Sequence, residues 1–141
     1  GARVTMESLR EGLRRLTVTQ VGFHRCGGLH AAGLFGVDSR DDLVREDVGR
    51  HNAVDKVLGR CALDDRWPVE AQSLVISGRA GYEIVQKAHR AGVSTVASVG
   101  APSGRAVELA VRAGITLVGF LATERPSIYS EPGRIVSDAS G

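Results

Sequence analysis

Apolar residues recur along this chain at spacings that predict alternating helices and strands. Met6, Leu9, Leu13 and Leu16 fall at positions i, i+3, i+7 and i+10, which is typical of a helix with one buried face. Short apolar runs bounded by glycine or by polar clusters predict strands between such helices. The predicted elements are a helix over 5–16, strands over 29–37 and 43–48, a helix over 51–63, a strand over 73–77, a helix over 82–91, a strand over 94–99, a helix over 103–113 and a strand over 115–121.

The order of these elements predicts a layered α/β fold. The first two strands flank a polar loop and indicate an antiparallel hairpin, whereas the last three alternate with helices, which requires right-handed parallel crossovers. We therefore expect one domain over residues 1–141, a three-layer α/β/α fold with a mixed sheet and helices on both faces. In the second helix, the residues predicted to point into the core are Val54, Val57, Leu58 and Leu63.

The composition of the chain mainly excludes classes of function. Hydrophobic residues make up 43% of the chain and aromatic residues only 4%, so the core is predicted to consist mainly of aliphatic side chains. A net charge of +2 is too small to indicate non-specific nucleic-acid binding. No apolar stretch reaches the roughly 20 residues of a membrane helix and no signal-peptide pattern is found, so we expect a cytoplasmic protein that binds no membrane.

The loops that follow the three predicted parallel strands are candidates for ligand binding, since ligands of open α/β sheets bind beyond the carboxyl ends of the strands. Two of these loops lead into helix N-termini, where free N–H groups favour an anion. The same serines and glycines are also ordinary helix caps, so both interpretations stay open, with anion binding favoured. The candidate residues in these loops are Ser77, Gly78, Arg79, Ser98, Gly100, Ser103, Thr123, Glu124 and Arg125.

A dense polar stretch over 45–56 is a further candidate, because Arg50, His51 and Asn52 fall at a strand-to-helix turn on the expected ligand side of the sheet. The histidines and cysteines do not have the spacing of a zinc site, and no serine lies in the motif of a nucleophilic hydrolase. Cys26 and Cys61 are not paired, and Cys26 is more typical of a small buried residue than of a nucleophile. We therefore predict a phosphate-binding domain with no catalytic residue and no metal site.

Four segments together resemble a known family: Gly27-Gly28-Leu29-His30-Ala31-Ala32, the run 45–56, Ser77-Gly78-Arg79 and the run 97–103. In these segments the chain resembles the C-terminal domain of the formate dehydrogenase accessory protein family, FdhD, from about Gly27 to Val136. The resemblance implies a core similar to the cytidine deaminase fold. It also implies a sulfur carrier that takes persulfide sulfur from a cysteine desulfurase and passes it to bis-molybdopterin guanine dinucleotide, containing Mo or W, for formate dehydrogenase.

The same resemblance implies a cofactor-binding stretch at Phe120, Leu121, Ala122, Thr123, Glu124 and Arg125, in which family members usually have an arginine where this chain has Ala122. The cofactor is bound cargo, and GDP is its expected analogue. The complete predicted binding set adds Gly27, Gly28, His30, Arg50, Asn52, Ser77, Gly78, Arg79, Ser98, Gly100 and Ser103. The resemblance further implies a homodimer.

The family's persulfide cysteine lies in a CxxC motif upstream of the matching region, and neither Cys26 nor Cys61 aligns with it. We therefore expect this chain to be a fragment that binds the cofactor but does not itself transfer sulfur. Two alternatives stay open. The first is a non-enzymatic docking scaffold for the desulfurase or the dehydrogenase, and the second, more distant, is a zinc-dependent deaminase. Deaminases need an H-x-E motif and a cysteine pair, whereas His30 is followed by Ala31-Ala32.

Overall fold

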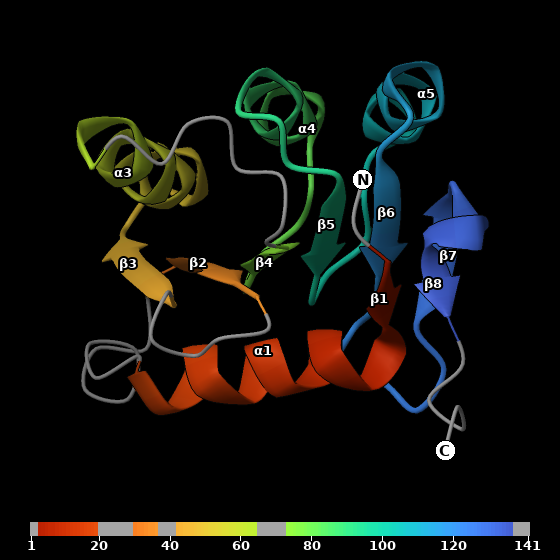
Figure 1. Ribbon diagram of the computed structural model, residues 1–141, viewed down its shortest axis with the longest axis horizontal. Helices are drawn as coiled ribbons and strands as arrows, with labels where there is room; N and C mark the ends of the chain where they lie inside the picture. Colours follow the sequence, from red (N-terminus) through yellow and green to blue (C-terminus); the bar gives the residue numbers. More distant parts are fainter. Residues whose placement is uncertain (1–2, 20–29, 37–41, 65–72, 137–141) are drawn as a thin grey trace.

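A mixed six-stranded sheet forms the centre of the computed structural model, which describes residues 3–19, 30–36, 42–64 and 73–136 (Figure 1). The strand order across this sheet is β3-β2-β4-β5-β6-β7. The strands span His30–Phe35 (β2), Leu43–Asp47 (β3), Ser73–Ile76 (β4), Thr95–Ser98 (β5), Thr116–Gly119 (β6) and Ser127–Ser130 (β7). A separate two-stranded sheet pairs β1 (Val4–Thr5) with β8 (Ile135–Val136), which follows a short 3-10 helix, η2 (Pro132–Arg134).

Strand directions confirm the predicted mixed sheet. Strand β2 pairs antiparallel with both β3 and β4, while β4, β5 and β6 are parallel to one another. The sequence did not predict β7, which pairs antiparallel with β6, or the β1–β8 pair. Because of these directions, β3, β4, β5 and β6 all end at one edge of the sheet, and β2 begins there. We call this the carboxyl edge.

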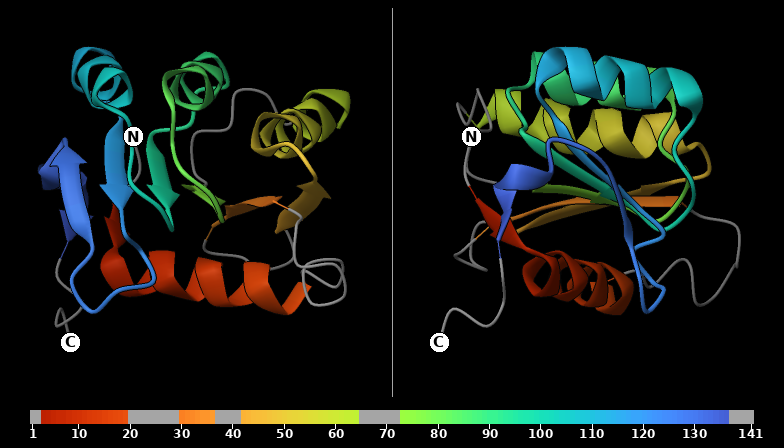
Figure 2. Two further views of the ribbon diagram at one scale, coloured as in Figure 1. Left: turned by 180° about the vertical axis from the view of Figure 1, so that it is seen from behind. Right: turned by 90° about the vertical axis from the view of Figure 1, so that its right-hand side faces the viewer.

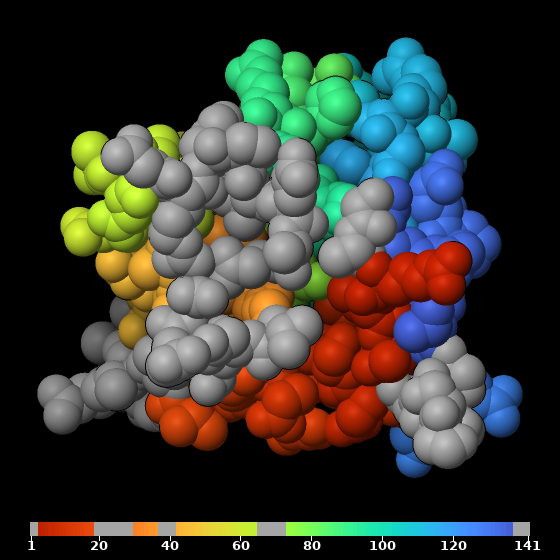
Figure 3. All heavy atoms as spheres, in the orientation of Figure 1, coloured from red at the N-terminus to blue at the C-terminus, as the bar shows by residue number. Residues whose placement is uncertain are grey.

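Helices cover both faces of the sheet, as predicted (Figure 2). Helix α1 (Met6–Thr19) lies on one face, and α3 (Arg50–Leu63), α4 (Tyr82–Arg90) and α5 (Gly104–Ala113) lie on the other. In the space-filling view, α1 lies along one side of the molecule and α4 and α5 lie at the opposite side (Figure 3). The likeness of the core to cytidine deaminases stays a prediction.

Two apolar clusters hold the layers together, one on each face of the sheet. On the α3 side, Val54, Val57 and Leu58 are buried, as predicted, but Leu63 is 80% exposed and the prediction for it is wrong. At 100° per residue, Leu63 lies half a turn away from Val54, and Cys61 takes the inward position instead. On the α1 side, Leu9 and Leu16 are buried, as the amphipathic pattern predicted.

Two glycines allow α1 to approach the sheet closely. A Cβ added to Gly33 of β2 would lie 2.5 Å from Cε2 of Phe35, and one added to Gly12 of α1 would lie 3.1 Å from Cδ2 of the same ring. The Phe35 ring therefore occupies space that side chains at these positions would need. The guanidinium of Arg15 lies over the ring, 5.2 Å from its centre.

Arg134 fastens the end of the described chain to the opposite edge of the sheet. Its Nη1 donates hydrogen bonds to the carbonyl oxygens of Ser94 and Gly114, at 2.9 and 3.0 Å, and to Oγ1 of Thr116 at 2.9 Å. Gly114, which ends α5, has a φ of 73°, a left-handed conformation that glycine adopts without strain. Within the described residues, no helix combines the length and the apolar character needed to cross a membrane.

Candidate functional site

Backbone hydrogen bonds join the loops that follow β4, β5 and β6 at the carboxyl edge. The N–H of Gly100 donates to the carbonyl oxygen of Gly78 at 3.0 Å, and the N–H of Phe120 donates to that of Gly100 at 3.4 Å. The N–H of Leu121 donates to the carbonyl oxygen of Ser98 at 3.0 Å. The three loops singled out in the sequence therefore form one continuous surface.

The glycines of these loops allow polar side chains to approach the backbone closely. A Cβ on Gly78 would lie 3.2 Å from Nδ1 of His30 and 3.7 Å from Cδ of Arg50. A Cβ on Gly100 would lie 2.8 Å from Cγ of Arg79. His30 of β2 and Arg50 at the start of α3 therefore lie beside Gly78, and Arg79 lies beside Gly100.

The turn between β3 and α3 is held by Asp47, which sequence reasoning missed. One carboxylate oxygen pairs with Nζ of Lys56 at 2.8 Å, and the other accepts the N–H of Gly49 at 3.0 Å and Nδ2 of Asn52 at 3.4 Å. These contacts lower the pKa of Asp47 from 3.8 to about 2. The hydrogen bond from Lys56 has the largest effect, and the hydrogen bond from the N–H of Gly49 has the next largest. Asn52, predicted to bind ligand, therefore also fixes the turn that presents Arg50.

A hollow of about 560 Å³ opens where α3, α4 and α5 begin. Helices α3 and α4 start after Gly49 and Gly81, which provide no side-chain cap, so their first N–H groups remain oriented toward this end of the sheet. Ser103 does cap α5, since its Oγ accepts the N–H of Ala106 at 3.1 Å. The residues that line the hollow are Arg50, His51, Gly81, Tyr82, Glu83, Ser103, Gly104, Arg105 and Glu108.

Arg105 and Tyr82 of this hollow were not among the predicted site residues. The guanidinium of Arg105 lies 4.6 Å from the centre of the Tyr82 ring, and Nε2 of His51 lies 3.9 Å from a carboxylate oxygen of Glu83. Tyr82 is the first residue of α4 and Arg105 is the second residue of α5, and each helix follows the loop after a parallel strand. Their place at the start of a helix that follows a strand and a loop is the sequence signal that could have identified these two residues.

Two of the predicted hydroxyls are engaged within the protein. Oγ of Ser77 accepts the N–H of Ala31 at 2.9 Å, and Oγ of Ser98, which is fully buried, donates to the carbonyl oxygen of Gly100 at 2.8 Å. These serines fix the ends of β4 and β5. Neither serine caps a helix, so the helix-cap interpretation holds only for Ser103, whose Oγ accepts the N–H of Ala106.

The stretch 120–125 leaves β6 through a strained turn. Phe120 has a φ of 54°, which is costly for a bulky residue and often marks a functional site, and its side chain is 38% exposed. Oγ1 of Thr123 donates to the carbonyl oxygen of Phe120 at 2.8 Å. Leu121 is buried beneath, whereas the residues from Ala122 to Arg125 are exposed. The turn therefore holds four exposed residues at the carboxyl edge.

The predicted residues Gly27 and Gly28, together with Cys26, lie outside the described residues. Cys61 is fully buried in the core on the α3 side. Among the described residues, no three His, Cys, Asp or Glu side chains are grouped so that they would hold a metal ion.

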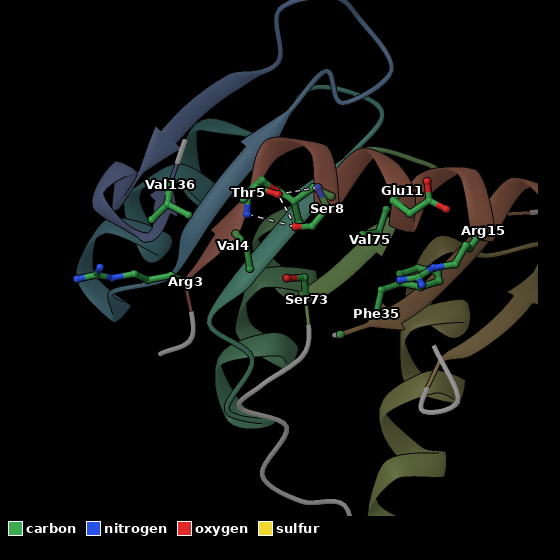
Figure 4. A pocket seen from close by; sticks show the side chains of 12 residues that line it. Arg3, Val4, Thr5, Ser8, Glu11, Arg15, Phe35, Ser73, Val75 and Val136 are labelled. Carbon is green, nitrogen blue, oxygen red and sulfur yellow. Dashed lines mark hydrogen bonds between the residues drawn. The ribbon is translucent and has the colours of Figure 1, made fainter. Parts of the chain in front are cut away.

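A second cavity, of about 430 Å³, lies away from the carboxyl edge, between α1 and the beginning of β4 (Figure 4). Its lining includes Leu9, Phe35 and Val75, with Arg15 at its rim. Beside it, reciprocal hydrogen bonds between Thr5 and Ser8 cap α1 (Figure 4). None of the predicted site residues that the structure describes lines this cavity.

The sequence model of the FdhD/NarQ family matches residues 1–136, nearly the whole chain and every described element at the carboxyl edge. The chain belongs to the FdhD/NarQ family. This confirms the resemblance that the four sequence segments indicated. The residues that lie at the carboxyl edge are thus all within the part of the chain that matches the family.

Relatives in the FdhD/NarQ family are similar along this whole chain. A sulfur carrier protein FdhD from Nocardia farcinica is 47% identical over 141 residues, and one from Mycobacterium tuberculosis is 50% identical over 131 residues. These matches cover 100% and 93% of this chain but 50% and 46% of the relatives. The chain thus spans about half the length of the curated FdhD proteins that it matches.

A solved structure supports the same assignment. A crystal structure from Desulfotalea psychrophila, of a protein described as a formate dehydrogenase accessory protein, superposes with a TM-score of 0.86 at 29% sequence identity. The match covers 96% of this chain and 60% of that chain. The layered fold described above is therefore that of a solved FdhD-type protein.

Proposed function

We propose that this chain is the cofactor-binding part of a sulfur carrier that serves formate dehydrogenase. In this proposal, persulfide sulfur comes from a cysteine desulfurase and passes to bis-molybdopterin guanine dinucleotide, with Mo or W as the metal of the cargo. Membership of the FdhD/NarQ family and the names of the relatives support the general role. The proposal that this chain binds the cofactor is based on the residues at the carboxyl edge.

The observation that supports binding most strongly is the convergence of three backbone-linked loops beside Arg50 and Arg79. A guanine dinucleotide carries diphosphate groups, and arginine guanidinium groups bind phosphate oxygens through paired hydrogen bonds. Helix N-termini without side-chain caps add N–H donors and a favourable dipole on the same side. The donor set at this edge therefore fits an anionic dinucleotide.

Sulfur transfer is assigned to a part of the full-length protein beyond the described residues. A sulfur-carrying cysteine needs an accessible thiolate, whereas Cys61 is fully buried among apolar side chains. The described residues accordingly contribute binding and orientation of the cargo. We further propose that the full-length protein acts in the cytoplasm as a homodimer that meets the desulfurase and formate dehydrogenase there.

Calorimetric titration with GDP tests this proposal. We expect micromolar binding that weakens at least tenfold, about 1.4 kcal/mol, in the separate variants Arg79→Ala and Arg125→Ala. Arg112→Ala is the matched control, because Arg112 is exposed in the last turn of α5, far from that helix's N-terminus. Absence of heat with the unmodified chain, or equal losses in all three variants, would contradict a nucleotide site at this edge.

A further inference from the structure

Arg10 of α1 contacts the exposed stretch that follows β6. Its Nη2 donates hydrogen bonds to the carbonyl oxygen of Glu124 at 2.9 Å and to that of Thr123 at 3.3 Å. The loop that joins β6 to β7 runs beside α1, so a half-buried side chain of this helix reaches it (Figure 1). A single guanidinium thus binds two successive peptide groups of the proposed binding stretch.

This contact fixes where the neighbouring N–H groups point. In a trans peptide the carbonyl oxygen and the N–H lie on opposite sides of the bond. The peptide that contains the Thr123 carbonyl also contains the N–H of Glu124, and the peptide that contains the Glu124 carbonyl also contains the N–H of Arg125. Both N–H groups are therefore directed away from Arg10.

Neither of these N–H groups donates a hydrogen bond to another residue in the part of the chain that the structure describes. Glu124 and Arg125 are both exposed, so the two donors lie in an exposed stretch that also carries the Arg125 side chain. Successive N–H groups that point to one side form a concavity that binds an anionic oxygen. Two further restraints hold this geometry, namely the buried Leu121 side chain and the hydrogen bond from Thr123 to Phe120.

We propose that Arg10 is a positioning residue for anion binding, which turns the N–H groups of Glu124 and Arg125 toward a phosphate oxygen of the ligand. This inference rests on the proposed function, because it names the backbone donors of the same nucleotide site. Arg10 itself touches no ligand; it acts by holding the two carbonyl oxygens on the helix side. The ligand chemistry is a nucleoside diphosphate, and GDP is the probe.

The test compares three variants in α1 by calorimetry with GDP. Arg10→Met removes the guanidinium and keeps an unbranched side chain, and we expect the dissociation constant to rise about tenfold. Arg10→Lys keeps the charge and a donor that can reach one carbonyl, so we expect a rise of no more than about threefold. Arg14→Met is the matched control, because Arg14 lies one turn further along and bonds to Glu7 and Glu11; its affinity should stay unchanged.

A second measurement distinguishes positioning from a general effect on stability. In amide NMR spectra of the unmodified chain, saturating GDP should move the signals of Glu124 and Arg125 downfield, as expected for new hydrogen bonds to an anion. In Arg10→Met, saturated at a higher GDP concentration, both shifts should be lost while the signals of the α5 residues respond as before. Circular dichroism would establish that this variant is folded.

The outcomes separate this inference from the proposed function. If the unmodified chain binds GDP and Arg125→Ala weakens binding, but Arg10→Met retains both affinity and amide shifts, the role of Arg10 is wrong and the nucleotide site stands. If the unmodified chain does not bind GDP, the nucleotide site is wrong, and the role of Arg10 is overturned with it.

Discussion

The close approach of α1 to the sheet predicts that alanine at Gly33 destabilises the protein. The new Cβ would lie 2.5 and 2.6 Å from two atoms of the Phe35 ring and 3.2 Å from Cδ1 of Leu16. Contacts under 3 Å cannot persist, so the ring must move. Phe35 is only 4% exposed and is packed under α1, which leaves the ring little room to turn.

The magnitude follows from two opposing terms. Overpacking a filled core costs about 1–3 kcal/mol, whereas replacing glycine by alanine in a strand recovers about 0.5–1 kcal/mol of backbone entropy. We therefore expect Gly33→Ala to lower the free energy of unfolding by about 1–2 kcal/mol. For a chain of this size, that loss lowers the melting temperature by roughly 3–10 °C.

Urea and thermal unfolding followed by circular dichroism measure this change, with Gly59→Ala as the matched control. Gly59 lies within α3, and a Cβ there would meet no atom within 4 Å, so alanine should stabilise the helix by up to about 1 kcal/mol. The two substitutions should thus have opposite signs. If Gly33→Ala stabilised the protein as Gly59→Ala does, or cost as much in a Phe35→Leu background, the clash with the ring would be refuted.

Three further perturbations test other parts of the structure. Because the pKa of Asp47 is lowered from 3.8 to about 2, its contribution to stability is present above pH 3.8 and is lost as the pH falls through 2. Urea unfolding should therefore show Asp47→Asn less stable than the unmodified chain at pH 6, with a difference that shrinks steadily as the pH falls from 3.8 through 2. Gly100→Ala should displace the flexible Arg79 side chain, so GDP affinity should fall several-fold in calorimetry while the melting temperature changes little. Arg134→Met removes three hydrogen bonds at once and should cost about 2–3 kcal/mol in thermal unfolding, whereas a loss below about 0.5 kcal/mol would show that water replaces them.

Most of the fold was predictable because each long element has a periodic apolar pattern. The exceptions are elements that depend on pairing rather than on their own sequence. Strand β7 has only Ile128 and Tyr129 as apolar residues and follows a proline, and the strands β1 and β8 have two residues each. Such segments are extended because a partner strand is beside them, and the partner is set by the tertiary fold.

The candidate site was predictable in place but less so in detail. The rule for parallel strands located the three loops correctly, since it depends only on strand direction. The roles of Ser77 and Ser98 were not predictable, because a hydroxyl group bonds to whichever backbone group the fold brings near it. The same holds for Arg10, whose partners lie 113 and 114 residues further along the chain.

The strand order at the carboxyl edge has a consequence for folding. His30 begins β2, which lies between β3 and β4, and the remaining site residues extend to Arg125, beyond β6. Loops separated this far in sequence meet only after the non-local strand pairs have formed, which is a slow and late event. A partly folded chain would therefore present no complete binding surface. In the proposed function, the ligand would bind only after the whole sheet has assembled. A bound ligand would then raise the free energy of every unfolding event that breaks this edge.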